Sequence, residues 1–154
     1  MRRLFFIPTF FFCFFTFAFT QVPPDKDGLL NAEGMGQGIY ADMNGYPGPK
    51  HVLDLAGKLQ LTDAQKQSVE RIYIEMAARA KELGQRIVSL EVELHKAFED
   101  KLVVERSVRN DAEQIGKLRG RLRAVHLNAH LKTRGILTEK QIEMYMKLRN
   151  AEKK

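Results

Sequence analysis

Residues 61–98 read LTDAQKQSVERIYIEMAARAKELGQRIVSLEVELHKAF and carry the pattern that decides the fold. Threonine followed three residues later by glutamine is a capping box, in which each side chain bonds to the other residue's backbone amide at a helix start. Behind the box, apolar residues recur every three or four positions, which predicts one long amphipathic helix. This stripe consists of Val69, Ile72, Met76, Ala80, Leu83, Ile87, Leu90, Leu94 and Phe98.

A second apolar stripe predicts another long helix after a break at residues 99–106. We expect Ser107 to cap this helix and Gly135 to end it in the left-handed conformation that glycine tolerates. Two long helices joined by a short loop form an antiparallel hairpin. The second stripe consists of Val108, Ala112, Ile115, Leu118, Leu122, Val125 and Ala129.

The pentapeptide pattern of residues 61–65 returns as LTEKQ at residues 137–141. This second capping box predicts a last helix, so each copy of the pattern turns the chain and starts a helix. Pro49 fits the first turn of a further short helix, where a proline loses no helical hydrogen bond. Nothing resembles a strand, so the sequence predicts an all-α domain at residues 50–150, followed by a charged tail at 151–154.

The first 20 residues are typical of a secretory signal peptide. Two arginines precede an uncharged apolar run, and residues 18–20 form a small-x-small cleavage pattern. The alternative is a retained membrane anchor, but the run is shorter than the roughly 20 apolar residues of a spanning helix and contains Pro8. Cleavage would remove Cys13, the only cysteine, so the mature chain would have no thiolate ligand and no disulfide.

Residues 21–49 hold four of the five prolines and six of the eleven glycines, without helical or strand period. We therefore expect an extended, largely mobile arm. Cleavage of the signal peptide would leave 23 basic and 19 acidic residues, a net charge of +4. A basic exported protein meets membrane surfaces, acidic clients or envelope polymers rather than genomic DNA, which argues against nucleic-acid binding.

The signal peptide, the Gly/Pro-rich arm and the long hairpin between two LTxxQ motifs together resemble the Spy/CpxP family of periplasmic proteins. That family includes zinc-associated ZraP-like proteins and, more distantly, CnrX-type heavy-metal sensors. The resemblance implies a cradle-shaped, four-helix dimer in the periplasm, and the small core of a lone hairpin separately favours a homodimer. The motif positions in this chain are Leu61, Thr62, Gln65, Leu137, Thr138 and Gln141.

The resemblance implies one of two roles. The chain could hold unfolded or envelope protein clients without ATP, as a chaperone or stress-response accessory. Alternatively, it could sense or buffer a heavy metal and act with an inner-membrane signalling partner. No cofactor is required for the first role, whereas the second would use a zinc, nickel or cobalt ion.

Two histidines, His126 and His130, stand four residues apart and could share one metal ion. Measured from Leu122, they lie about 40° and 80° round the helix, at the edge of the apolar stripe. A turn near residue 103 would bring Glu75 opposite, giving a His-His-carboxylate set that suits zinc, nickel or cobalt. His51 is a further possible ligand, while the other interpretation is that both histidines are boundary residues that cover the stripe.

The second long helix is basic, and its densest part is KLRGRLR at residues 117–123. Lys117, Arg121 and Arg123 could attract acidic, partly unfolded clients, or they could form a solvated outer face. An enzyme is not expected, because no nucleophile elbow, phosphate-binding glycine loop or H-E-x-x-H pattern occurs.

Overall fold

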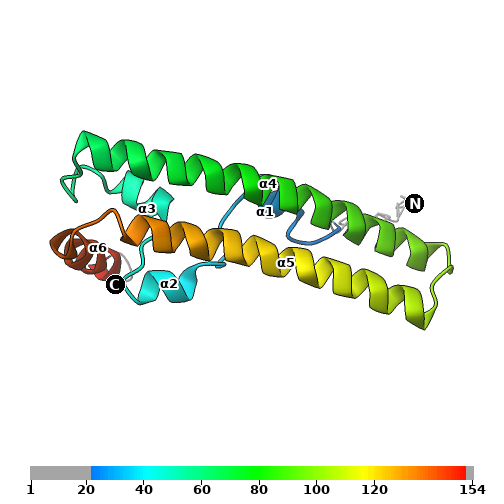
Figure 1. The fold of residues 1–154 in the computed structure, drawn as a ribbon. Coiled ribbons are helices and arrows are strands. Elements are labelled where there is room, and N and C mark those ends of the chain that lie inside the picture. The colour runs from blue at the N-terminus through cyan, green and yellow to red at the C-terminus, as the bar shows by residue number, and fades with distance from the viewer. Residues whose placement is uncertain (1–21, 152–154) are drawn as a thin grey trace, which may run out of the picture.

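The computed structural model describes residues 22–151, in which every regular element is a helix (Figure 1). The predicted signal peptide and the charged tail beyond residue 151 lie outside the described residues. None of the described helices has the length and apolar character needed to cross a bilayer. The helices are α1 (Lys26–Leu30), α2 (Ile39–Met43), α3 (Pro49–Asp54), α4 (Asp63–Glu99), α5 (Glu105–Arg134) and α6 (Glu139–Ala151).

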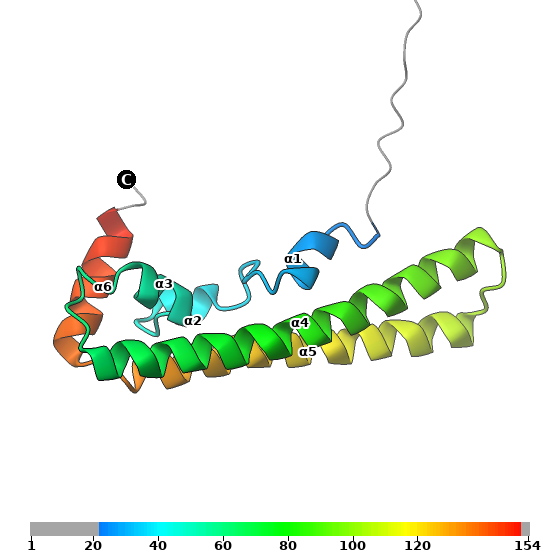
Figure 2. The same ribbon diagram turned by 90° about the horizontal axis from the view of Figure 1, so that it is seen from above.

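The two long helices α4 and α5 lie antiparallel and form the predicted hairpin (Figure 1). The hairpin is gently curved, and α1, α2 and α3 all lie on its concave side (Figure 2). We call the end that carries α3 and α6 the base, and the connection at residues 98–104 the tip. The all-α hairpin with short flanking helices is therefore confirmed.

Both predicted capping boxes are present at the base. The backbone N–H of Gln65 donates to Thr62 Oγ1 (3.2 Å), and the N–H of Thr62 donates to Gln65 Oε1 (3.1 Å). Thr138 and Gln141 repeat the arrangement at 3.3 and 2.9 Å. These bonds satisfy amides that the first helical turn leaves without partners, which is why α4 and α6 start where they do.

The two LTxxQ motifs also bind each other. Gln65 Nε2 donates to Gln141 Oε1 (2.9 Å), and Gln141 Nε2 donates to Gln65 Oε1 (3.0 Å). Each amide reaches the opposite loop as well, at the carbonyls of Ile136 (3.0 Å) and Leu59 (3.3 Å). The repeated pattern thus caps two helices and joins them across 76 residues of sequence.

The core divides into two apolar clusters. The first fills the base between α3, α4 and α6 and consists of Val52, Leu55, Leu59, Val69, Leu137, Ile142 and Tyr145. The second lies halfway along the hairpin and consists of Leu29, Ala80, Ile87, Leu118 and Leu122.

Two expected helix ends differ in the structure. Helix α5 begins at Glu105, so Ser107 is not its cap but its third residue, and Ser107 Oγ accepts the backbone N–H of Val104 (3.2 Å). Gly135 is right-handed (φ −68°) because the chain turns on directly into the loop before α6. A left-handed residue stands instead after α4, at Lys101 (φ +57°) in the tip, where Leu102 N–H bonds back to Ala97 O (3.0 Å), and Gln60 before α4 is also left-handed (φ +52°).

The expectation of an extended arm is wrong for residues 22–48, which we call the N-terminal segment. This segment forms α1 and α2 and runs along the concave side of the hairpin (Figure 2). Leu29 is only 1% exposed, because its side chain completes the central apolar cluster. The segment has no sequence period because its order comes from contacts with α4 and α5 rather than from its own helices, which are too short to be stable alone.

Candidate functional site

The two predicted ligand histidines are buried beneath the N-terminal segment. His126 and His130 are only 3% and 8% exposed, so the expectation that the edge of the stripe leaves them reachable from solvent is wrong. The spacing within α5 does not show what packs on it from elsewhere in the chain, and Gly38 and Gly48 of the N-terminal segment lie against His130.

His130 fits between two glycines. Its Nδ1 lies 2.6 Å from the carbonyl oxygen of Tyr46, and because a carbonyl only accepts, this nitrogen carries the proton. A Cβ atom at Gly38 would lie 2.2 Å from His130 Nε2, and one at Gly48 would lie 3.0 Å from Cε1. The imidazole ring therefore holds the N-terminal segment against α5, and its second nitrogen faces backbone.

His126 has a different environment. Its Nε2 is buried and makes no hydrogen bond to a protein atom. Burial, together with the neighbouring His130, lowers the pKa of His126, so its neutral form is favoured. A neutral imidazole with a free nitrogen can accept a hydrogen bond or bind a metal ion.

A cavity of about 400 Å³ lies between the N-terminal segment and the hairpin. His51, His126 and His130 all line it, together with Met76 and Tyr73. Nevertheless, within residues 22–151 no three His, Cys, Asp or Glu side chains are grouped closely enough to hold a metal ion. The structure thus brings three of the four predicted ligands to one cavity without forming a ready coordination site.

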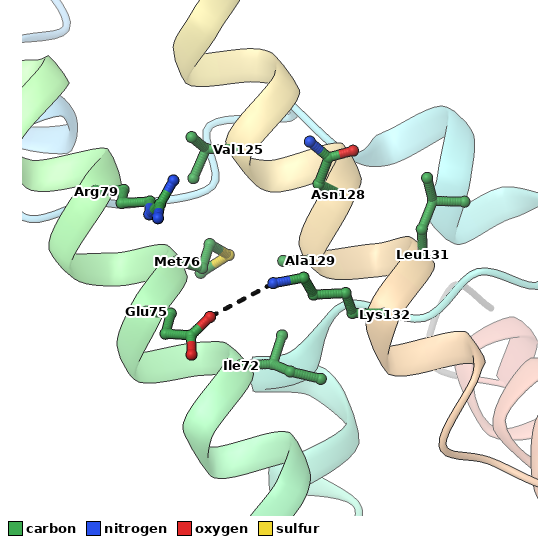
Figure 3. Close-up of a pocket in the computed structure, with 9 residues that line it drawn as sticks. All are labelled: Ile72, Glu75, Met76, Arg79, Val125, Asn128, Ala129, Leu131 and Lys132. Atoms are coloured by element: carbon green, nitrogen blue, oxygen red, sulfur yellow. Dashed lines mark hydrogen bonds and ion pairs between the residues drawn. The ribbon is translucent and has the colours of Figure 1, made fainter.

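Glu75 is the predicted ligand that lies elsewhere. It borders a groove on the outer, convex side of the hairpin, where its carboxylate is 3.4 Å from Lys132 Nζ (Figure 3). Its neighbour Met76 is buried between the helices, and one residue turns a helix by about 100°. Glu75 lines the groove and is not among the residues that line the histidine cavity.

The groove that Glu75 borders runs between α4 and α5 on the side away from the N-terminal segment (Figure 3). It has two connected parts of about 390 and 320 Å³, which share Arg79, Val125 and Asn128. We call it the outer groove. Its apolar lining residues are Ile72, Met76, Leu83, Ala124, Val125, Ala129 and Leu131, and its charged ones are Glu75, Arg79, Glu82, Arg121 and Lys132.

The three basic residues predicted to attract clients separate in space. Arg121 lines the outer groove. Arg123 instead lies over the ring of Tyr40 in the N-terminal segment, 5.8 Å from its centroid. Lys117 is exposed on α5. Only Arg121 is therefore placed to contact a chain bound in the outer groove.

A polar cluster at the base was not predicted. Asp42 on α2 accepts a short hydrogen bond from the hydroxyl of Tyr145 on α6, and it lies near His51 (3.8 Å) and Arg149 (3.4 Å). Burial alone would raise the pKa of Asp42, but hydrogen bonds from His51 and Tyr145 and the charge of Arg149 hold it well below its usual range. The cluster joins three helices and explains how Tyr145 can be fully buried.

No family model, curated protein or solved structure matches the chain. The resemblance to the Spy/CpxP family therefore stays a prediction that rests on the two LTxxQ motifs and their positions in the sequence.

Proposed function

We propose that the chain is a periplasmic chaperone or envelope-stress accessory of Spy/CpxP type, which binds unfolded or envelope proteins without ATP and without chemistry. In this proposal it is exported by its signal peptide and works as a homodimer. One observation carries the proposal: an apolar groove with a partly basic rim runs along the convex side of the hairpin.

The lining of the outer groove suits an unfolded chain. Leu131, a large aliphatic residue, is 57% exposed there, and Val125 and Ile72 are half-buried. Exposed apolar surface bordered by polar groups is typical of interaction sites. Lys132 is paired with Glu75, and Arg79 and Arg121 outnumber the remaining acidic residue, Glu82. The small excess of positive charge attracts acidic chains over distances of about a Debye length.

The proposal is tested by aggregation of a chemically denatured client with residues 21–154 present, in a chelator and without nucleotide. Leu131→Ser should weaken the suppression of light scattering several-fold, because it removes apolar surface from the groove. Leu102→Ser is the matched control, since Leu102 is 75% exposed at the tip, outside the groove. Failure of the wild-type protein to suppress aggregation, or equal effects of both variants, would refute the proposal.

A second candidate is a periplasmic sensor or buffer for zinc, nickel or cobalt. The observation that favours it is the convergence of His51, His126 and His130 on one cavity with Met76. Because Gly38 lies against His130 Nε2, binding through both α5 histidines would require the N-terminal segment to move. Metal binding should therefore lower the protection of residues 38–48 against hydrogen exchange.

Thermal melts with chelator and with each metal test this second candidate. A metal at about 100 times its dissociation constant stabilises a fold by about 2.7 kcal/mol. The shift should vanish in His126→Ala/His130→Ala and persist in His95→Ala, because His95 is exposed on α4 and distant in sequence from the cavity residues. Equal melts with and without metal in the wild-type protein would exclude the metal role.

A further inference from the structure

Helix α1 lies on the concave side of the hairpin (Figure 2), and its Leu29 packs into a socket of buried residues there. The socket is formed by Ala80, Gly84 and Ile87 on α4 and by Leu118 and Leu122 on α5, and Leu29 is its occupant. We call these five residues the α1 socket. Leu29 is the buried apolar side chain of α1, so its removal from water is the main apolar contribution to the docking of this helix.

Gly84 sets the depth of the socket. A Cβ atom at this position would lie 2.1 Å from the carbonyl oxygen of Leu29, a distance that no real Cβ contact reaches. Glycine in a helix interior is destabilising relative to alanine. Its presence inside α4 therefore lets another polypeptide backbone lie directly against the helix.

An ion pair stands beside the socket. Arg119 on α5 bonds both carboxylate oxygens of Asp25, at 2.7 and 3.2 Å, and also bonds Glu91 at 2.8 Å. The hydrogen bond from Arg119 lowers the pKa of Asp25, which keeps this carboxylate charged. Asp25 precedes Leu29 by four residues, so the site recognises an acidic residue and a leucine at this spacing.

The backbone of the N-terminal segment is strained just after α1, the helix that occupies the socket. Ala32 and Met35, which follow α1, have φ angles of +55° and +41°. A residue with a side chain is disfavoured in this left-handed region, because its Cβ atom comes too close to the following carbonyl oxygen. Helix α1 itself has only five residues, and a helix of that length is not stable without its contacts. The segment therefore occupies the socket at some conformational cost.

We propose that the α1 socket is an exchangeable peptide-binding site, which takes a flexible segment of another protein with an acidic residue four positions before a leucine. Residues 22–48 fill the site within the same chain and limit access to it. The α1 socket lies on the side of the hairpin opposite the outer groove. This inference rests on the proposed function only in taking the partner to be an unfolded or flexible polypeptide.

The test uses residues 21–154 with Asp25→Asn/Leu29→Ala, which weakens the internal occupant and leaves the socket unchanged. The probe is a fluorescein-labelled peptide of residues 22–35, VPPDKDGLLNAEGM. We expect this variant to bind the peptide at least about tenfold more tightly than the wild type, because it lacks a tethered competitor at high effective concentration. Circular dichroism checks that the hairpin remains helical, and Asp25→Asn alone serves as a milder variant.

Two further substitutions in that variant locate the peptide. Adding Gly84→Ala should abolish binding, because its methyl group takes the place of the peptide backbone. Adding Gly116→Ala should leave binding unchanged, since nothing lies within 4 Å of a Cβ atom at Gly116. Equal peptide affinity in the wild type and in the Asp25→Asn/Leu29→Ala variant, or equal effects of the two glycine substitutions, would overturn the proposal.

The same proteins separate this proposal from the proposed chaperone function. If no protein, including the wild type, suppresses aggregation but peptide binding still depends on Gly84, the socket proposal is supported and the chaperone function is refuted. If aggregation suppression depends on Leu131 and peptide binding is unaffected by Gly84→Ala, the outer groove is supported as the client site and the socket proposal is refuted.

Discussion

The base and the tip of the hairpin are held together in different ways. At the base, α3 and α6 pack on α4 around Tyr145, and the Gln65–Gln141 pair joins the two loops. At the tip, α4 and α5 stand alone, and Phe98 and Leu102 are 52% and 75% exposed. The same three-and-four spacing of apolar residues runs through both ends, so the flanking elements, not the stripe, decide where side chains are buried.

The comparison predicts that truncation at the base costs far more stability than truncation at the tip. Tyr145→Ala should lower the free energy of unfolding by about 3–5 kcal/mol, since it removes a fully buried aromatic ring. Phe98→Ala should change it by less than about 0.5 kcal/mol. Urea denaturation of both variants measures the difference, and similar losses at the two ends would contradict the comparison.

The buried carboxylate at the base predicts a pH dependence that the tip lacks. Because the pKa of Asp42 is lowered in the folded protein, its contribution is complete above the unfolded pKa of 3.8 and is lost as the pH falls below that value. Asp42→Asn should cost about 2 kcal/mol at neutral pH, since it weakens hydrogen bonds to a charged group. The gap to the wild type should be narrower at pH 3 than at pH 7 without closing there, because the pKa of Asp42 in the folded protein lies far below its unfolded value.

Denaturation at pH 7, 5 and 3 tests this expectation. Asp100→Asn is the control, because Asp100 is an exposed residue at the tip. A gap for Asp42→Asn that is constant with pH, or that widens in acid, would show that its charge does not stabilise the base.

The glutamine pair predicts coupling between residues that are distant in sequence. Gln65→Ala and Gln141→Ala should each cost about 1 kcal/mol, because each removes half of a capping box. The double variant should lose at least about 0.5 kcal/mol less than the sum, since either single change already breaks the shared amide bonds. Gln85→Ala, exposed on α4, should be nearly neutral, and strict additivity would mean that the two motifs act separately.

The smallest expected effects come from opposite substitutions at the two ends: a residue is replaced by glycine at the tip, and a glycine is replaced by alanine at the base. Lys101→Gly at the tip should stabilise the protein by about 0.5–1 kcal/mol, because glycine relieves the left-handed conformation. Gly135→Ala at the base should stabilise it by about 0.4–1 kcal/mol, because Gly135 has a negative φ and ordinary space for a Cβ atom. Thermal melts measure both changes, and destabilisation by Lys101→Gly would contradict the assignment of strain to Lys101.

The sequence was sufficient for the elements that depend on local rules. The capping boxes at Thr62 and Thr138 and the spacing behind them determine where α4 and α6 start, and these rules involve only neighbouring residues. The pairing of Gln65 with Gln141 was not predictable, because it needs the register of the whole hairpin. Sequence spacing likewise could not show that Glu75 lies on the convex side.

The burial of His126 and His130 could not be predicted for a related reason. What covers them is the N-terminal segment, which has neither helical nor strand period and is ordered by contacts such as that between Tyr46 O and His130. The glycines at positions 38 and 48 were the one sequence signal of this packing, although glycine-rich segments are more typical of mobile arms. In the structure these two glycines instead give room to an imidazole ring.

The bonded LTxxQ pair has a consequence for how such a hairpin can evolve. Since Gln65 and Gln141 fix α4 against α6 and α5 at the base, the alignment of the two long helices is set from that end. Seven residues added to each long helix near the tip would lengthen the rod by about 10.5 Å and keep every side chain on its original side. Insertions near the base would instead break the pair, so natural variation in length should accumulate at the tip.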